Sequence, residues 1–340
     1  MRIRIVGIFL ALCLIPVMPS CKRNPYRVNI SAVSAGVEIT RLEKDLFEPD
    51  PLAVPAAIPE LRKKYGTFLQ LFSYVINAGS VSDTSFSSSL VNFCTDKLNN
   101  EVYQSVMQLY PDVTAIESDL AKAFRHYKYY FPGKSIPSIH TCITGFNNSL
   151  IIGDSVIGIG LDRYLGKESG YYERLQIYRY LAIRMNPWNI VPDCMYAWGT
   201  SEWDLASIGY SKDDVMTEMI HEGKIRYFQR CMMPDINDTV LFGFTADQMR
   251  FCRNNEMQMW QYLVEHDLLF SSDQFTIRKL VGEAPFTTFF TNESPGRAAA
   301  WLGFRIVESY MMKNRNVSME EMMGNTDVQG ILTAARYDPQ

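Results

Sequence analysis

The chain has 340 residues, with 33 lysines and arginines against 37 aspartates and glutamates, and its formal net charge at pH 7 is −4. This near balance, without a run of lysine or arginine, excludes the basic surface of a typical nucleic-acid-binding protein. Hydrophobic residues make up 47% of the chain and aromatic residues 13%, which is enough to build a full core without disulfides or metal ions.

The first 21 residues have the pattern of a lipoprotein signal peptide. Arg2 and Arg4 precede an uncharged apolar run over residues 5–18, which is shorter than the roughly 20 residues that a spanning helix needs. Ser20 then places a small residue directly before Cys21, as in a lipobox. We expect cleavage after residue 20 and a lipid on Cys21 that anchors the chain to an envelope membrane. The alternative is a plain secretory signal peptide with an incidental cysteine, or an uncleaved anchor.

The rest of the chain divides into a short tether and one domain. Residues 21–36 are polar and rich in small side chains, which is typical of a tether, and no later stretch is comparably loose. We predict a single domain over residues 37–340. Its cysteines are scattered without a Cys-x-x-Cys pair, so we interpret them as mostly buried thiols. They are Cys94, Cys142, Cys194, Cys231 and Cys252.

Hydrophobic periodicity predicts the elements of this domain in chain order. Apolar residues at three- and four-residue steps predict amphipathic helices over residues 55–72 and 112–131. Short apolar runs over residues 137–161, separated by Asn-Asn and Gly-Asp turns, predict two or three strands. The rest is helical, with start signals at Ser211, Thr245 with Gln248, Ser294 before Pro295, and Ser318 with Glu321. We therefore predict an α+β fold that is helix-rich around one small sheet.

The helix predicted over residues 215–231 carries the strongest chemical signal. Its apolar stripe must face the core, whereas Glu218, His221 and Glu222 share the opposite side. His221-Glu222 is the first half of an HExxH zinc-peptidase motif, in which a second histidine one turn later also binds the metal. Ile225 stands at the position of that second histidine. The pattern therefore favours a lost metal site, and a solvated polar helix face is the structural alternative.

Two further helices add candidate binding residues. In the helix predicted over residues 246–264, Glu256 lies at the centre of the apolar stripe, where a carboxylate needs a cation, a metal or a raised pKa. The helix predicted over residues 295–313 carries Arg297 and Arg305, and either guanidinium would form a natural pair with Glu256. We interpret Glu256 as part of a functional site or, equally, as one half of a buried ion pair that fixes packing.

Several stretches taken together resemble the gliding-motility lipoprotein family GldB. They are HYKYYFP (126–132), ITGFNNSLIIGDSVIGIGLDRYLG (143–166), MIHEGKIRYF (219–228), FTADQMRFCRNNEMQMWQYLVEHDLLFSSD (244–273) and NESPGRAAAWLGFRIVESYM (292–311). The resemblance rests on their order and spacing and covers most of the chain after residue 110. It implies a degenerate, zincin-like architecture derived from a metalloprotease, and a role with the gliding and type IX secretion machinery.

From these observations we predict a non-enzymatic lipoprotein without a cofactor, whose former peptidase cleft binds a peptide or a partner protein. The residues predicted to line that cleft are Glu218, His221, Lys224, Glu256, Trp260, Arg297 and Trp301. The expected partners are a membrane, through the lipid, and envelope proteins of the gliding and secretion machinery. One alternative is a zinc-dependent metallopeptidase that uses His221 and Glu222, and the other is a purely structural envelope lipoprotein.

The residues after Cys21 predict the side of the envelope. Surface-exported lipoproteins of the bacterial group that this sequence resembles tend to carry acidic residues shortly after the lipidated cysteine. Lys22 and Arg23 occupy those positions here. We therefore expect the domain to face the periplasm.

Overall fold

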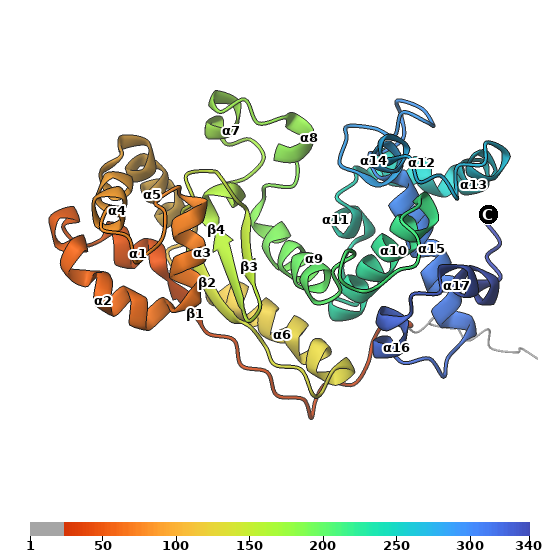
Figure 1. The fold of residues 1–340 in the computed structure, drawn as a ribbon, viewed down its shortest axis with the longest axis horizontal. Helices are drawn as coiled ribbons and strands as arrows, with labels where there is room; N and C mark the ends of the chain where they lie inside the picture. The colour runs from red at the N-terminus through yellow and green to blue at the C-terminus, as the bar shows by residue number, and fades with distance from the viewer. Residues whose placement is uncertain (1–23) are drawn as a thin grey trace, which may run out of the picture.

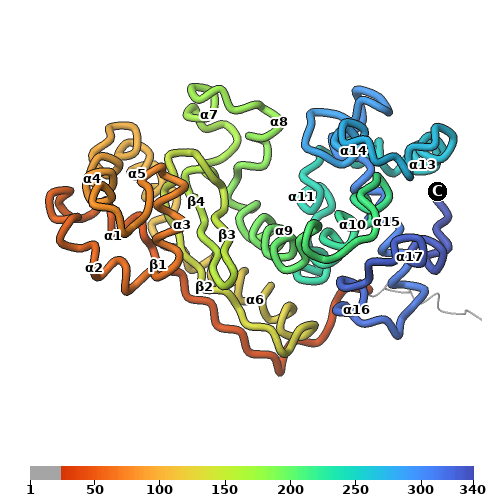
Figure 2. Tube along the Cα trace, in the orientation of Figure 1, coloured from red at the N-terminus to blue at the C-terminus, as the bar shows by residue number. Residues whose placement is uncertain are grey.

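The structure, a computed structural model, describes residues 24–340, so the predicted signal peptide and Cys21 lie outside the described residues. Figure 1 shows a small sheet with the N-terminal helices on one side and the C-terminal helices on the other. Residues 24–38 begin beside the C-terminal helices and run along the edge of the molecule below α6 (Thr114–Tyr130) to the sheet, as the tube in Figure 2 traces. The two groups of helices are thus joined by this segment as well as by the sheet.

The sheet has four strands in the order β1-β2-β4-β3. They are β1 (Ile39–Arg41), β2 (Ser138–Cys142), β3 (Leu150–Gly153) and β4 (Val156–Gly160). β2 pairs in parallel with β1 and β4, whereas β3 and β4 are antiparallel. The strands predicted over residues 137–161 are confirmed, and there are three of them. The sequence does not predict β1, because three residues are too few to show an alternating pattern.

The helices of the first group cover one face of this sheet. They are α1 (Leu42–Phe47), α2 (Val54–Tyr65), α3 (Thr67–Val75), α4 (Phe86–Thr95) and α5 (Lys97–Leu109), with a 3-10 turn η1 (Pro51–Ala53). The single helix predicted over residues 55–72 is wrong, since it divides into α2 and α3. Gly66 has a φ of 52° at the break, a conformation that ends a helix and that glycine adopts readily.

The second group surrounds α10 (Val215–Met232), which contacts α6, α9, α11, α14, α15, α16 and α17. Its other helices are α7 (Gly170–Arg174), α8 (Arg179–Ala182), α9 (Ile190–Glu202), α11 (Asp238–Phe242), α12 (Ala246–Asn254), α13 (Glu256–Glu265), α14 (Gln274–Val281), α15 (Ala298–Lys313), α16 (Met319–Gly324) and α17 (Val328–Ala335). Two 3-10 turns, η2 (Leu161–Tyr164) and η3 (Pro187–Asn189), precede α7 and α9. Because neighbours surround α10, residues on both of its sides are buried.

The predicted helix starts are partly confirmed. Thr245 with Gln248 and Ser318 with Glu321 each form a complete capping box. The start at Ser211 is wrong. The carboxylate of Asp214 accepts a hydrogen bond from the backbone N–H of Thr217, so Asp214 caps the helix and α10 begins at Val215. The start at Ser294 is also wrong. The hydroxyl of Ser294 is buried and bonded to the backbone of Thr287, and α15 begins at Ala298.

The helix predicted over residues 246–264 forms as two helices, α12 and α13. Asn255 lies between them with a φ of −120° and is not helical. Glu256 is consequently the first residue of α13 and does not sit in the middle of a continuous helix.

The fold class is helix-rich α+β with one small sheet, as predicted. The five cysteines of the described part of the chain are all buried and unpaired, which confirms their interpretation as thiols. In residues 24–340, none of the helices has the length and apolar character required to span a bilayer.

Candidate functional site

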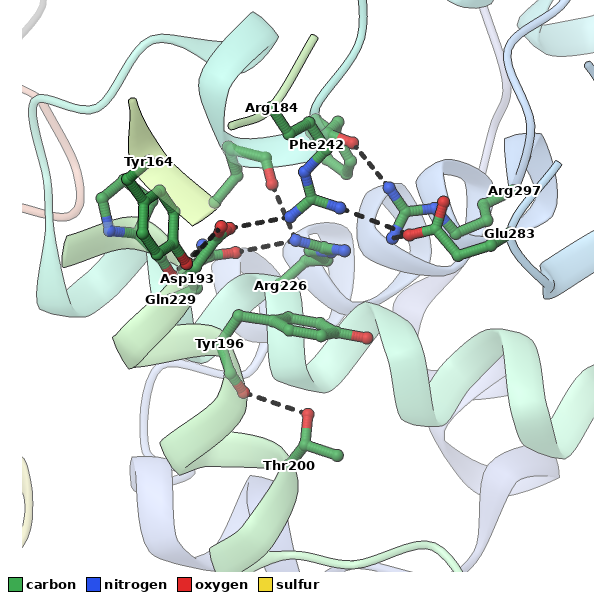
Figure 3. A network of polar contacts seen from close by, with 12 residues as sticks. Tyr164, Arg184, Asp193, Tyr196, Thr200, Arg226, Gln229, Phe242, Glu283 and Arg297 are labelled. Carbon is green, nitrogen blue, oxygen red and sulfur yellow. Dashed lines mark hydrogen bonds and ion pairs between the residues drawn. The ribbon is translucent and has the colours of Figure 1, made fainter. Parts of the chain in front are cut away.

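Three guanidinium groups come together where α9, α10 and α11 meet the loops before α9 and after α14 (Figure 3). They belong to Arg184, in the loop before α9, Arg226, on α10, and Arg297, directly before α15. The side chains of Arg226 and Arg297 are 2% and 9% exposed, and that of Arg184 is 19% exposed. We call this set and its partners the arginine network.

Arg226 is the most deeply buried member of the network. It donates hydrogen bonds to the backbone carbonyl of Leu241, at 2.8 Å, and to Oε1 of Gln229, at 3.1 Å. Its guanidinium lies 3.9 Å from the centre of the Tyr196 ring, close enough for a cation–π interaction. Glu222, one turn earlier on α10, is its nearest carboxylate, at 4.0 Å. This arginine is therefore fixed from three sides.

Arg184 and Arg297 share one carboxylate. Oε1 of Glu283 lies 3.3 Å from Arg184 and 3.0 Å from Arg297. Arg184 also pairs with Asp193 at 2.8 Å, and Arg297 donates to the carbonyl of Phe242 at 3.2 Å. The side chain of Glu283 is 48% exposed, so this carboxylate joins two buried cations from the solvent side.

The network holds three positive and three negative groups. Burial lowers the pKa of Arg297 to about 10, and the neighbouring guanidiniums of Arg226 and Arg184 add to this effect. Burial also lowers the pKa of Arg184, but Asp193 and Glu283 more than offset it. Arg184 and Arg297 therefore remain charged at neutral pH. Removal of any one carboxylate would leave buried positive charge uncompensated, which proteins avoid.

A cavity of about 230 Å³ opens onto the network. Its polar lining comes from Ser149, Arg163, Tyr164, Arg184, Asp193 and Tyr196. Among the described residues, Nε of Arg184 and Oε2 of Glu222 are buried polar atoms without a hydrogen-bond partner. Guanidinium groups present several N–H donors in a planar arrangement that matches a carboxylate or a phosphate. The cavity therefore presents the guanidinium groups of Arg163 and Arg184 beside the carboxylate of Asp193.

The other polar residues predicted on α10, namely Glu218, His221 and Lys224, lie away from the network, and His221 and Lys224 are buried. Nδ1 of His221 lies 3.2 Å from the Tyr210 hydroxyl, and Nζ of Lys224 lies 2.9 Å from that hydroxyl. Nζ of Lys224 also donates to the carbonyls of Met323 and Asn325, at the end of α16. Burial lowers the pKa of His221 to about 4 and that of Lys224 to about 8, and it raises the pKa of Glu218.

His221 and Glu222 point in different directions despite being adjacent. His221 faces Tyr210, whereas Oε1 of Glu222 accepts a hydrogen bond from the Tyr196 hydroxyl at 2.8 Å. Burial raises the pKa of Tyr196 to about 12, with a further contribution from Glu222, so the phenol stays a hydrogen-bond donor. Residues 24–340 contain no group of three or more histidine, cysteine, aspartate or glutamate side chains placed to hold a metal ion.

Glu256 is buried and paired, as predicted. Its Oε1 accepts hydrogen bonds from Nε of Arg305, at 3.3 Å, and from the Tyr337 hydroxyl, at 2.7 Å. The ring of Trp260 packs edge-on against Tyr337, with 5.4 Å between ring centres. Glu256 and Trp301 both line a second cavity of about 300 Å³.

The seven predicted cleft residues thus lie in three different surroundings. Glu218, His221 and Lys224 lie on the Tyr210 side of α10. Glu256, Trp260 and Trp301 lie at the second cavity or at its edge. Arg297 lies in the arginine network. Sequence reasoning missed the other members of the arginine network, which are Arg184, Tyr196, Arg226 and Glu283. Arg226 was within reach of such reasoning, because it lies one turn after Glu222 on the same helix. Arg184 and Glu283 lie in loops, where the sequence gives no such spacing.

The fold and the network define a helix-rich α+β protein with a polar pocket lined in part by arginines. Comparison with known families identifies it further, because the model of the gliding motility protein GldB family matches residues 23–339. The chain therefore belongs to this family. Neither the curated proteins nor the solved structures contain a match to the chain.

Proposed function

We propose that this GldB-family protein is a non-enzymatic, lipid-anchored envelope protein that faces the periplasm and serves the gliding and type IX secretion machinery. Acylated Cys21 is the anchor. We also propose that its fold descends from a zincin-type peptidase, which would account for the isolated His221-Glu222 pair. Its binding function lies at the arginine network, where it takes an acidic segment of a partner protein.

The position of Glu283 is the observation that supports this binding function. This half-exposed loop carboxylate neutralises two arginines whose side chains are at least four-fifths buried. A carboxylate from a partner would make the same two ion pairs if it replaced Glu283, so the exchange conserves charge. The adjoining cavity of about 230 Å³ has room for a side chain or a chain terminus.

The metallopeptidase alternative requires His221 and Glu222 to act on one metal-bound water. The two side chains instead engage different tyrosines, since His221 contacts Tyr210 and Glu222 contacts Tyr196. Ile225 supplies no ligand one turn later. A purely structural role is the second alternative, and the half-exposed position of the Glu283 carboxylate argues against it.

Selection from a peptide library on the immobilised protein tests the binding function. We expect enrichment of peptides that carry aspartate, glutamate or a free C-terminal carboxylate. Arg184→Gln should abolish this enrichment, whereas Arg179→Gln, at an exposed arginine five residues earlier, should preserve it. Selection of peptides without an acidic preference would contradict the proposal.

The lipid anchor has a separate test. Cys21→Ala should release the protein from the membrane fraction into the soluble periplasmic fraction. Protease treatment of intact cells should leave the wild-type protein whole, because the domain faces the periplasm. Retention of the variant in membranes at high salt would contradict the anchor, and cleavage in intact cells would contradict the orientation.

A further inference from the structure

A large apolar groove lies between α6, the start of α9 and the loop that follows α10. Its volume is about 740 Å³, and Val113, Ile116 and Val191 contribute to its walls. Trp188 and Leu109 also line it, and they are 63% and 44% exposed. Apolar surface of this extent in contact with water is typical of a binding site.

The apolar walls of this groove offer few hydrogen-bond partners, and its four charged lining residues, Asp112, Asp119, Lys122 and Asp235, are exposed. Four lining residues are prolines, which have no backbone N–H: Pro111, Pro187, Pro192 and Pro234. The carbonyls of Pro111, Pro192 and Pro234 already accept hydrogen bonds, from Arg41, Gln229 and Asn24 respectively. A bound peptide would leave its own backbone groups unpaired here, whereas a hydrocarbon chain has none to satisfy. The groove therefore suits an acyl chain better than a peptide.

The first described residues of the chain are attached to one wall of the groove. Nδ2 of Asn24 donates to the carbonyl of Pro234 at 2.8 Å, and Arg27 forms an ion pair with Asp235 at 2.7 Å. Both Pro234 and Asp235 line the groove. Tyr26, between Asn24 and Arg27 in the sequence, packs against Tyr227 and Arg230 of α10 and donates a hydrogen bond to Glu308 of α15. The start of the predicted tether is thus held on the domain.

This attachment limits how far the lipid can lie from the groove. Cys21 precedes Asn24 by three residues, which span at most about 11 Å when fully extended. A fatty acyl chain on Cys21 therefore begins within reach of the groove. Such tethering gives the chain a high effective concentration there, commonly in the millimolar range.

We propose that the groove holds one acyl chain of the lipid on Cys21, an inference that rests on the lipid anchor proposed above. Entry of the chain removes water from the apolar walls of the groove. The acyl chain itself moves from the apolar interior of the bilayer to the apolar groove, so the groove competes with the adjacent bilayer for the acyl chain. The other acyl chains of the same lipid remain available to hold the protein at the membrane.

Photo-cross-linking in intact cells tests this occupant directly. Trp188→p-benzoylphenylalanine places a benzophenone, which inserts into nearby C–H bonds on irradiation, at the groove. Leu109→p-benzoylphenylalanine does the same at a second exposed lining residue. We expect both variants to yield a cross-link to the lipid-bearing peptide that contains Cys21, identified by mass spectrometry. Tyr178→p-benzoylphenylalanine, at a residue 69% exposed and outside the groove lining, is the matched control and should give none.

A charge inside the groove provides the second arm. Val191→Glu, combined with either probe, should lower the yield of this cross-link at least tenfold while the circular dichroism spectrum stays unchanged. A cross-link to phospholipid or to another protein in place of the Cys21 lipopeptide would overturn the proposal. The proposal would also be overturned if Cys21 carries its lipid but neither benzophenone, at position 188 or at position 109, forms a cross-link to it. A Cys21 peptide without lipid is a different result, because it would overturn the anchor itself.

Discussion

Gly223 of α10 lies directly against Gly303 of α15. A methyl group at Gly223 would lie 2.3 Å from the carbonyl carbon of Gly303, and one at Gly303 would lie 1.8 Å from the carbonyl oxygen of Met219. The two helices therefore touch backbone to backbone. This contact sets the position of α10, and hence of Arg226 and His221, relative to the rest of the C-terminal helices.

We predict that Gly303→Ala lowers the free energy of unfolding by about 3 kcal/mol, because the new methyl group meets backbone atoms that cannot rotate away. Urea unfolding measures the change. Gly324→Ala is the matched control, since a methyl group there meets no atom within 4 Å, and it should change stability by less than about 0.5 kcal/mol. Equal stabilities of the two variants would contradict the close packing.

The limits of the sequence are visible at this helix pair. Periodicity predicts the helix around Gly223 and its apolar stripe, because hydrophobic spacing is a local property. It also predicts burial of one side alone, whereas the structure buries Ile225 and His221 as well. That difference arises because seven other helices contact α10, and such tertiary contacts leave no mark on the spacing of residues along the chain.

Lys224 supplies a prediction about pH. Its folded-state pKa of about 8, lowered by burial, lies below the ordinary lysine value of 10.5. The unfolded chain therefore binds more protons between pH 8 and pH 10.5, and folding becomes more favourable as the pH rises through this window. We expect the free energy of unfolding of the wild type to increase by about 3 kcal/mol relative to that of Lys224→Met between pH 8 and pH 10.5. Lys63→Met, at an exposed lysine, is the control, and its stability should change with pH in the same way as that of the wild type.

Asp162 predicts the opposite slope at lower pH. Its carboxylate is fully buried and accepts hydrogen bonds from the backbone of Thr144 and Phe146, and burial nevertheless raises its pKa to about 6. Because this pKa exceeds the unfolded value, the stabilisation is complete below about pH 4 and is lost as the pH rises through 6. Relative to Asp162→Asn, the free energy of unfolding of the wild type should fall by about 3 kcal/mol between about pH 4 and pH 6. A parallel pH profile for the two proteins in urea unfolding would refute this.

The sequence predicted the burial and pairing of Glu256 because a carboxylate on an apolar stripe has few other options. It did not predict the arginine network. That network joins Arg184 and Asp193 to Glu283, which lies 99 residues after Arg184, and a fold brings them together only after the helices have packed. Charged residues in loops have no periodicity from which such partners can be inferred.

Glu256 predicts a graded series of stability losses. Glu256→Gln weakens the ion pair with Arg305 and should cost about 2 kcal/mol, because the amide carries no charge and the site is buried. Tyr337→Phe removes one hydrogen bond to the same carboxylate and should cost about 1 kcal/mol. Thermal unfolding in low salt measures both. Glu265→Gln, at an exposed carboxylate of the same helix, is the control.

His221 provides the test that separates packing from metal chemistry. Its ring is 4% exposed and contacts the Tyr210 hydroxyl, so His221→Ala leaves a cavity and should cost about 2 kcal/mol of stability. We expect this cost to be the same before and after dialysis against EDTA, because Ile225 offers no second ligand and Glu222 is engaged with Tyr196. Since the histidine pKa is lowered to about 4 by burial, the ring is neutral at pH 7 and stabilises the fold most at and above that pH. Elemental analysis that finds about one zinc per chain, lost in His221→Ala, would restore the metallopeptidase alternative and contradict the proposal that the protein is non-enzymatic.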